Sequence, residues 1–466
     1  MITINLDNHS NIPLYEQIYS FIKNEIRIGS LPYGNKLPST RSLSSHLNVS
    51  RNTVDLAYSQ LLSEGYIESL PKSGYYVCQV EELAIPSESK QSKTHFTQIQ
   101  EQNYLYNFSP FAVDLDHFPY HTWRQLSKNC LSENNLLFLS GNNQGDEAFR
   151  YAIETYLHQS RGVNCTKEQI IIGAGVDYLL QLLINLLHRN RMIAMENPAY
   201  KRAYKIFNGL DCQTIPISLD EKGMNINELE SCSADIAYVT PSHQYPLGVV
   251  MPISRRMELL NWASSKPERY IIEDDHDSEF RYKGKPIPAL QGIDTHEKVI
   301  YIGTFSKAIA PAIRVGYMVL PYPLLEIYHN EFDYFASTVS RIDQSILTSF
   351  IEQGYFERHL NRMRKIYKSK HDALINALKI FGNNIDISGE NAGMHLVLKL
   401  KTTLSEEEII EKAALSGIKL YGLAEHFIHL PNDYSPSLLL GYANLTEDQI
   451  QSGIKLLHQT LNTTSN

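Results

Sequence analysis

The sequence has few of the features that mark secreted, membrane-embedded or zinc-binding proteins. Its five cysteines, at positions 78, 130, 165, 212 and 232, are scattered and include no C-x-x-C pair, which indicates reduced cytosolic thiols and no metal site. The N-terminus has no charged start followed by an apolar stretch, and two amide residues interrupt the longest apolar run, residues 178–187. We therefore expect no signal peptide, no membrane span and a cytoplasmic location.

The chain also lacks a global excess of positive charge. Its 466 residues hold 42 Lys and Arg against 51 Asp and Glu, a formal net charge of −9, and the length favours at least two domains. Residues 1–77 are neutral, with six bases and six acids, so the whole excess of acid lies in residues 78–466. Between Glu25 and Asp55 there is no acid, while four bases occur there: Arg27, Lys36, Arg41 and Arg51. This pattern favours nucleic acid contact at the N-terminal end alone.

The first 78 residues have the pattern of a winged helix-turn-helix. Apolar residues recur at helical spacing over 14–28, over 39–47 and again from Val54 until Gly65,. Asn48 suits a tight turn and Ser50 suits a helix N-cap. Two short β-rich runs, 66–68 and 75–77, then flank a turn that holds Lys72,. We therefore predict a DNA-binding domain over residues 1–78.

The residues expected to contact DNA are Arg41, Arg51, Asn52, Thr53 and Lys72, which lie at the front of the second helix of the motif or on the wing,. The plain alternative is a helical hairpin with solvated charges. The segments 38–41 (Pro-Ser-Thr-Arg), 49–54 (Val-Ser-Arg-Asn-Thr-Val) and 61–66 (Leu-Leu-Ser-Glu-Gly-Tyr) resemble the GntR family of bacterial repressors over about residues 10–77. That resemblance implies binding to double-stranded operator DNA.

Residues 79–104 are polar and lack an apolar period, as expected for a linker,. From residue 105 to 466, short apolar runs alternate with helical patterns, which predicts an α/β domain with a mostly parallel sheet and flanking helices. The predicted strands are 169–172, 191–195, 236–240, 270–274, 299–304 and 315–320. A long helical pattern over about 342–381 leads into a smaller C-terminal α+β part.

Three segments of this domain carry chemistry. Gly173-Ala174-Gly175 joins a strand to a helix, so its amides could hold a phosphate, although such glycines are often only turn residues. Three acids, 273–275, end an apolar strand, which is costly unless a partner such as a protonated ring nitrogen lies at the strand end; solvated acids are the alternative. Lys307 follows Thr304 and Ser306 on a loop, with Arg314 seven residues on, which suits a Schiff-base lysine beside a phosphate.

In this order the segments resemble fold-type I aminotransferases, which bind pyridoxal 5′-phosphate (PLP). The resemblance implies that Lys307 forms the Schiff base and that Asp274 pairs with the pyridine nitrogen. It further implies that Tyr200 stacks on the ring. The other cofactor contacts that it implies are Arg314, Thr304, Ser306, His276 and the amides of Gly175 and Val176. Tyr245 stands where the family has an asparagine that contacts the cofactor 3-hydroxyl.

A GntR-like head joined to such a body resembles the MocR/GabR regulators, which are PLP-dependent transcription factors that usually form head-to-tail homodimers. His276 replaces their usual tyrosine, and Asn444 stands where they have an arginine expected to hold a ligand carboxylate, which leaves Arg202 for that role. We therefore expect a sensor of PLP itself, similar to the PdxR regulators of vitamin B6 synthesis. The alternatives are a sensor of an amino acid or amine, an active aminotransferase, or a DNA-binding protein whose body is only a dimerisation scaffold.

Overall fold

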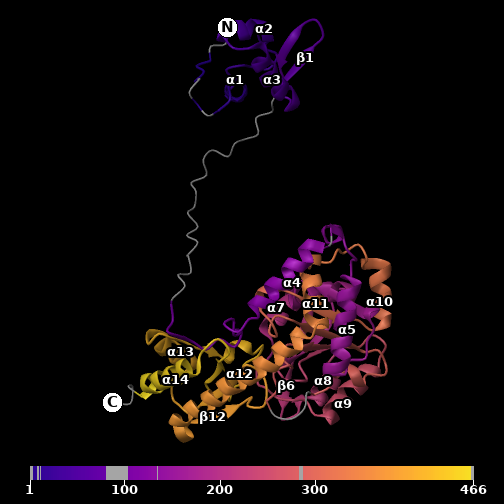
Figure 1. Cartoon of the computed structure of the whole chain (residues 1–466), viewed down its shortest axis with the longest axis vertical. Helices are drawn as coiled ribbons and strands as arrows, with labels where there is room; N and C mark the ends of the chain where they lie inside the picture. The colour runs from indigo at the N-terminus through magenta and orange to yellow at the C-terminus, as the bar shows by residue number, and fades with distance from the viewer. Residues whose placement is uncertain are drawn as a thin grey trace. The chain divides into compact units, whose positions relative to one another are not determined.

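The computed structural model describes residues 4–7, 10, 12–79, 103–133, 135–282 and 287–462. The chain divides into two compact units, Met1–Glu101 and Gln102–Asn466 (Figure 1). The predicted linker over 79–104 lies outside the described residues except at positions 79, 103 and 104. No helix within the described ranges is long and apolar enough to cross a membrane.

The N-terminal unit is a three-helix bundle followed by a two-stranded wing. Its elements are α1 (Leu14–Arg27), α2 (Thr40–Leu47), α3 (Arg51–Ser63), β1 (Ile67–Leu70) and β2 (Gly74–Val77), and the two strands are antiparallel. The side chains of Ser39 and Ser50 accept backbone N–H groups at the starts of α2 and α3,. Asn48 has left-handed backbone, φ 53°, so the two helices follow each other after a short turn. The predicted winged helix-turn-helix is confirmed.

The larger unit is built on an eight-stranded sheet with strand order β4-β11-β10-β9-β8-β5-β6-β7. The strands are β4 (Ile170–Gly173), β5 (Met192–Asn197), β6 (Gln213–Asp220), β7 (Gly223–Met224), β8 (Ile236–Val239), β9 (Tyr270–Asp275), β10 (Val299–Thr304) and β11 (Gly316–Val319). The neighbours from β10 through β9, β8 and β5 to β6 are parallel. Pairings with β11 and β7 are antiparallel. The predicted, mostly parallel sheet is therefore confirmed.

Both faces of this sheet are covered, as a parallel sheet requires. Alternate residues of β10 enter different cores: Ile300 and Ile302 pack into one hydrophobic cluster, whereas Tyr301 packs into another. The helices are α4 (Tyr120–Glu133), α5 (Glu147–Arg161), α6 (Val176–Leu186), α7 (Lys201–Gly209), α8 (Ile226–Ser231), α9 (Ile253–Ser264), α10 (Tyr322–Ile327), α11 (Arg341–Glu352), α12 (Tyr355–Leu378), α13 (Glu406–Leu415) and α14 (Glu447–Asn462). Short 3-10 segments lie at Asn135–Phe138, Lys167–Gln169, Gln291–Ile293, Pro311–Ile313, Lys379–Asn384 and Ala424–His426, with a π-helical turn at Tyr328–Phe332.

The long helical pattern predicted over 342–381 is divided between two helices. The segment forms α11 and α12, separated at Gln353 and Gly354, and it ends in a 3-10 turn. Gly354 has φ 70°, a left-handed conformation that a helix interior does not allow,. The apolar period continues across the break because both helices bury one face in the same core.

The smaller C-terminal part is α+β, as predicted. Its four-stranded sheet has the order β12-β13-β16-β15 with antiparallel pairs throughout. The strands are β12 (Ile385–Ser388), β13 (His395–Leu400), β15 (Tyr421–Gly422) and β16 (Ser437–Gly441). A further short pair joins β3 (Tyr106–Asn107) to β14 (Ile418–Lys419). The chain downstream of the predicted linker is thus held to this C-terminal part.

Candidate functional site

A cavity of about 500 Å³ opens beyond the carboxyl ends of β8, β9 and β10, where ligands bind in open α/β sheets. Nine of the ten side chains or backbone groups predicted to hold a cofactor or ligand line it: Val176, Tyr200, Arg202, Asp274, His276, Thr304, Ser306, Lys307 and Arg314. The tenth, Gly175, lies directly against Arg314. Segments that are more than 130 residues apart in sequence, about 175 to 314, are therefore brought to one place.

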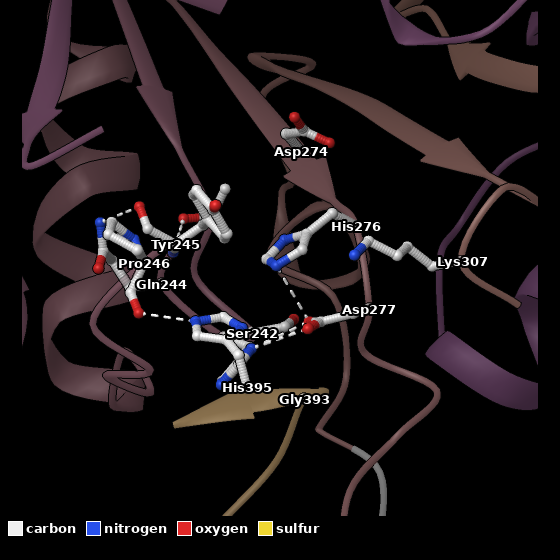
Figure 2. A network of polar contacts seen from close by, with 12 residues as sticks. Ser242, Gln244, Tyr245, Pro246, Asp274, His276, Asp277, Lys307, Gly393 and His395 are labelled. Carbon is white, nitrogen blue, oxygen red and sulfur yellow. Dashed lines mark hydrogen bonds and ion pairs between the residues drawn. The ribbon is translucent and has the colours of Figure 1, made fainter. Parts of the chain in front are cut away.

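Lys307 lies just after β10 and its side chain reaches into the cavity (Figure 2). Its Nζ donates to the carbonyl oxygen of Pro110 at 2.7 Å and lies 5.9 Å from the centre of the Phe111 ring. Burial lowers the pKa of Lys307 to about 8, although the charge of Asp277 opposes this shift. A lysine with such a pKa is in part a neutral amine near neutral pH, the form that attacks a carbonyl.

The three acids at the end of β9 have three different partners. Glu273 accepts the backbone N–H groups of Leu290 and Gln291, each at 2.8 Å, and Asp275 pairs with Arg161 at 2.8 Å. Only Asp274 faces the cavity. Of the three acids, Asp274 is therefore the one that could pair with a protonated ring nitrogen at the end of the strand.

Asp274 is incompletely satisfied by the protein. The hydroxyl of Tyr238 donates to Oδ2, while Oδ1 is buried without a hydrogen-bond partner among the described residues. Burial raises the pKa of Asp274, against the opposing effects of Tyr238 and of His276. A protonated ring nitrogen would satisfy Oδ1 and stabilise the ionised carboxylate, so this residue fits the role predicted for it.

The start of α6 and the loop before β11 form an anion-binding corner. Gly175 has φ 86° and ψ 175°, and a Cβ atom there would lie 2.8 Å from Arg314 Nη2. Exposed amides at a helix start, a guanidinium and nearby hydroxyls are the donors that a phosphate needs. Thr304 Oγ1 accepts the N–H of Ser306 at 3.1 Å, which fixes the loop that carries both hydroxyls.

Sequence reasoning missed Asp177, the second residue of α6. Its Oδ2 pairs with Arg314 Nη2 at 3.0 Å and with Arg202 Nη1 at 3.2 Å. One carboxylate therefore links the predicted phosphate arginine to the predicted ligand arginine. An acid in the first turn of a helix is common because it complements the helix dipole, so nothing in the sequence around Asp177 indicates this second role.

Two tyrosines stand on one side of the cavity. The rings of Tyr200 and Tyr245 meet edge to face with centroids 5.8 Å apart, and both line the cavity. The Tyr245 hydroxyl is buried and has no hydrogen-bond partner within the described ranges. Tyr245, which stands where the family has an asparagine, thus lines the same cavity.

His276 belongs to a buried polar cluster that the sequence did not reveal (Figure 2). Asp277 lies 3.2 Å from its Nε2 atom and 3.0 Å from Nδ1 of His243. The two imidazole rings are stacked with centroids 5.9 Å apart. The two histidines hold the pKa of Asp277 well below its usual range even though burial acts in the opposite direction.

Position 444, where the family resemblance implies a ligand-binding arginine, is not among the residues that line the cavity. Asn444 is exposed, its side chain donates to the Asn107 carbonyl at 3.2 Å, and it does not line the cavity. Position 444 follows β16 by three residues, beyond the part of that strand that enters the sheet.

The residues predicted to contact DNA lie on the N-terminal unit as expected from the motif. Arg41 is in the first turn of α2, and Arg51, Asn52 and Thr53 form the first turn of α3; Arg41, Arg51 and Asn52 are exposed. Lys72 is exposed in the turn of the wing with φ 61°. Thr53 is partly occupied, because its hydroxyl lies 2.8 Å from that of Ser50 in the helix cap.

Comparisons with known proteins agree with both units. Residues 14–77 match the bacterial regulatory proteins of the gntR family, and residues 111–457 match aminotransferase class I and II. A kynurenine aminotransferase from Pyrococcus horikoshii superposes with a TM-score of 0.70 at 26% identity, covering 78% of this chain and 92% of that one. The chain therefore belongs to the aminotransferase class I and II family, with a GntR-type DNA-binding domain and PLP as its cofactor.

Full-length relatives define the class more narrowly. The HTH-type transcriptional regulator YdeL of Bacillus subtilis is 40% identical over 98% of both chains. The probable rhizopine catabolism regulatory protein MocR of Rhizobium meliloti is 31% identical over 97% of this chain and 94% of its own. The pyridoxine biosynthesis transcriptional regulator PdxR of Corynebacterium glutamicum is 30% identical over 96% of both. The chain is thus a regulator of the MocR/PdxR type.

Proposed function

We propose that this regulator binds operator DNA through its N-terminal unit and changes that binding when PLP occupies the cavity. The proposal rests on one observation. A single cavity is lined by Lys307, by Asp274 with its unsatisfied carboxylate oxygen and by Arg314, and the same chain has a winged helix-turn-helix. The name of the PdxR relative, a regulator of pyridoxine biosynthesis, supports vitamin B6 as the signal.

Each cavity residue has a defined task. When bound, PLP supplies an aldehyde that condenses with a lysine amine with loss of water. Lys307 provides the partly neutral amine for this, and Asp274 accepts the N–H of the ring nitrogen. Arg314, the hydroxyls of Thr304 and Ser306 and the amides of Gly175 and Val176 bind the phosphate, while Tyr200 packs on the ring and His276 contacts its polar edge.

Sensing, rather than turnover, is the proposed role of this chemistry, so we assign no catalytic residue. Turnover requires a site that holds the carboxylates of two successive substrates in register. Arg202 and Arg314 both pair with Asp177. With Arg314 assigned to the phosphate, Arg202 is the one predicted arginine left for a substrate carboxylate. Acting on operator DNA, the protein would work in the cytoplasm.

At the DNA, we assign Arg51, Asn52 and Thr53 of α3 to the major groove and Lys72 to the wing contact, with Arg41 of α2 beside them. Their support is the exposure of the charged side chains and the position of α3 as the recognition helix of the motif,. We also propose domain limits of 1–78, 79–104 and 105–466, which the two family matches support.

A homodimer is the proposed assembly. Apolar side chains of α4 and the following 3-10 turn are more than half exposed in the single chain: Leu131, Leu136, Phe138 and Leu139. A surface of this kind marks an interface more often than a free face. Light scattering after size exclusion checks this, and a monomer at micromolar concentration would contradict it.

An amino acid or amine sensor is the second candidate. Three cations near the cavity mouth, Lys201, Arg202 and Lys205, favour a ligand with a carboxylate. In the first candidate PLP alone suffices, whereas the second needs a further ligand on the PLP-loaded protein.

One titration separates the two candidates. Fluorescently labelled operator is titrated with PLP-free protein, then with protein plus PLP or plus pyridoxal, which lacks the phosphate that Arg314 would bind. We expect PLP, and not pyridoxal, to shift the operator affinity. If PLP has no effect while one amino acid shifts the affinity of the loaded protein, the PLP-sensor proposal is wrong and the second candidate replaces it.

A further inference from the structure

The side chains of His276 and Asp277 meet beside the cavity (Figure 2). Together with His243 they form a trio of possible metal ligands. His243 Nδ1 lies 3.0 Å and His276 Nε2 lies 3.2 Å from the same carboxylate oxygen, Asp277 Oδ1. One ligand-type atom from each residue lies within 4.8 Å of the other two. Two imidazoles and one carboxylate are thus gathered from two loops, one after β8 and one after β9.

One ring nitrogen of the trio faces Asp277 without an aligned hydrogen bond. His276 Nε2 is buried and has no aligned hydrogen-bond partner in the described part of the chain, despite its short distance to Asp277. Nδ1 of His243, whose side chain is 2% exposed, is the ring nitrogen that faces the trio, since it lies 3.0 Å and 3.2 Å from the two carboxylate oxygens of Asp277. Unsatisfied buried polar atoms are costly and call for an explanation, and a metal ion would use the lone pair of a neutral imidazole nitrogen.

Packing holds two members of the trio in place and leaves the third open. A Cβ atom at Gly393 would lie 2.2 Å from His243 Cε1 and 3.0 Å from Asp277 Oδ2, so only glycine fits behind them. The Gly393 carbonyl accepts the hydroxyls of Tyr282 at 2.6 Å and Tyr442 at 2.8 Å. This backing fixes the ligand positions, as outer contacts do in metal sites. His276, in contrast, lines the cavity.

We propose that His243, His276 and Asp277 bind a divalent transition-metal ion of the Zn²⁺ type, with the remaining coordination position open to the cavity. Two imidazoles and one carboxylate suit Zn²⁺ or Co²⁺ better than Mg²⁺ or Ca²⁺, which prefer all-oxygen sites. Three protein ligands with one open position are the arrangement of catalytic zinc sites. The proposal goes beyond the sensor function, because it requires neither DNA nor PLP.

The test uses the full chain freed of PLP and of metal by a chelator. Calorimetric titration with ZnCl₂ should give one ion per chain, and titration with Co²⁺ should give the intense visible bands of four- or five-coordinate cobalt. His243→Ala, His276→Ala and Asp277→Asn should each weaken binding by about tenfold or more. The matched control is His395→Gln, because His395 is equally buried next to His243 but uses its Nε2 on the Pro246 carbonyl at 2.9 Å.

Two outcomes overturn the proposal. One is the absence of saturable Zn²⁺ binding by the wild-type chain, which would make the trio a hydrogen-bonded structural cluster only. The other is binding that is unchanged in the His243 and His276 variants. Should the alanine variants fold poorly, His276→Tyr keeps an aromatic side chain at the cavity and must also lose the cobalt bands.

Discussion

Lys307 shows how strongly the surroundings of one residue set its chemistry. Burial lowers its pKa from the usual 10.5 to about 8, so about half of the amine is neutral at pH 8 and the neutral fraction levels off only near pH 10. We expect the rate at which PLP attaches to the PLP-free protein to follow this curve. Stopped-flow absorbance between about pH 6 and 10 measures it, and a rate still rising beyond pH 10 would mean an ordinary exposed lysine.

A second experiment identifies the lysine to which the cofactor attaches. After borohydride reduction and digestion, the cofactor should be found on the peptide that contains Lys307, and Lys307→Ala should leave no reducible attachment. Attachment to another lysine, for example Lys201 or Lys205 at the cavity mouth, would contradict the assignment.

Gly175 is a residue whose role depends on its backbone. Its φ of 86° and ψ of 175° fall in a region that is essentially restricted to glycine and costs other residues about 1–3 kcal/mol. We expect Gly175→Ala to lower the free energy of unfolding by about that amount and to weaken PLP binding, since the new Cβ would press on Arg314.

A thermal melt and a PLP titration check both effects. The matched control is Gly209→Ala, where no atom lies within 4 Å of the new Cβ and φ is not positive. Equal PLP affinity in the Gly175 variant and the wild type would mean that the start of α6 is not part of the phosphate site.

The sequence predicted those site residues whose position follows from a strand or from the loop next to it. Asp274 ends β9 and Lys307 follows β10, and the carboxyl ends of neighbouring parallel strands meet at one edge,. Arg314 precedes the antiparallel strand β11, whose start lies opposite the end of β10. The trio and Asp177 were not predictable, because their partners come from contacts across loops. Nothing in the segment around His243 marks it as the neighbour of Asp277.

Helix α3 is the element on which the predicted DNA binding is best tested. Arg51 begins this helix, and its Nε lies 3.5 Å from Asp55 Oδ2, one turn on. If Arg51 reads a base, Arg51→Ala should cost about 1–3 kcal/mol of operator affinity. Asp55→Asn should act oppositely and tighten binding, because it frees Arg51 and removes a negative charge near the DNA phosphates.

Mobility shifts over a series of salt concentrations measure both variants. Arg27→Ala, at the end of α1, is the control for loss of a basic side chain elsewhere on the same unit and should change affinity little. An Arg51 variant that binds like the Arg27 variant would exclude α3 as the recognition helix.

Elements with strong periodicity were predictable, and weak ones were not. The helices of the N-terminal unit begin and end close to the predicted residues because Ser39, Asn48 and Ser50 give clear cap signals. Strand β6, in contrast, was missed: it contains Pro216, and its polar and apolar residues alternate with many exposed. It lies near the sheet edge, where burial no longer produces a continuous apolar run.

For the whole molecule, the two units must be coupled reciprocally if PLP regulates the operator. Any factor by which PLP changes operator affinity must equal the factor by which operator changes PLP affinity. We therefore expect the PLP dissociation constant, measured by absorbance at equilibrium, to shift in the presence of operator by the factor seen in the DNA titration. Scrambled DNA of the same length is the control, and an unchanged constant would mean that PLP does not act as the signal.

The hydrogen bond from Lys307 to Pro110 connects the cavity to the segment that leads toward the DNA-binding domain, as such a coupling would require. The amine that donates to the Pro110 carbonyl at 2.7 Å is the nitrogen that would lose its hydrogens on condensing with the PLP aldehyde. Pro110 follows β3, the first strand after the predicted linker, and Phe111 next to it lines the cavity. The segment that leads toward the DNA-binding domain is thus hydrogen-bonded to the nitrogen that would bind the cofactor. Attachment of the cofactor would break or weaken this hydrogen bond, and the first part of the chain to be released would be that segment.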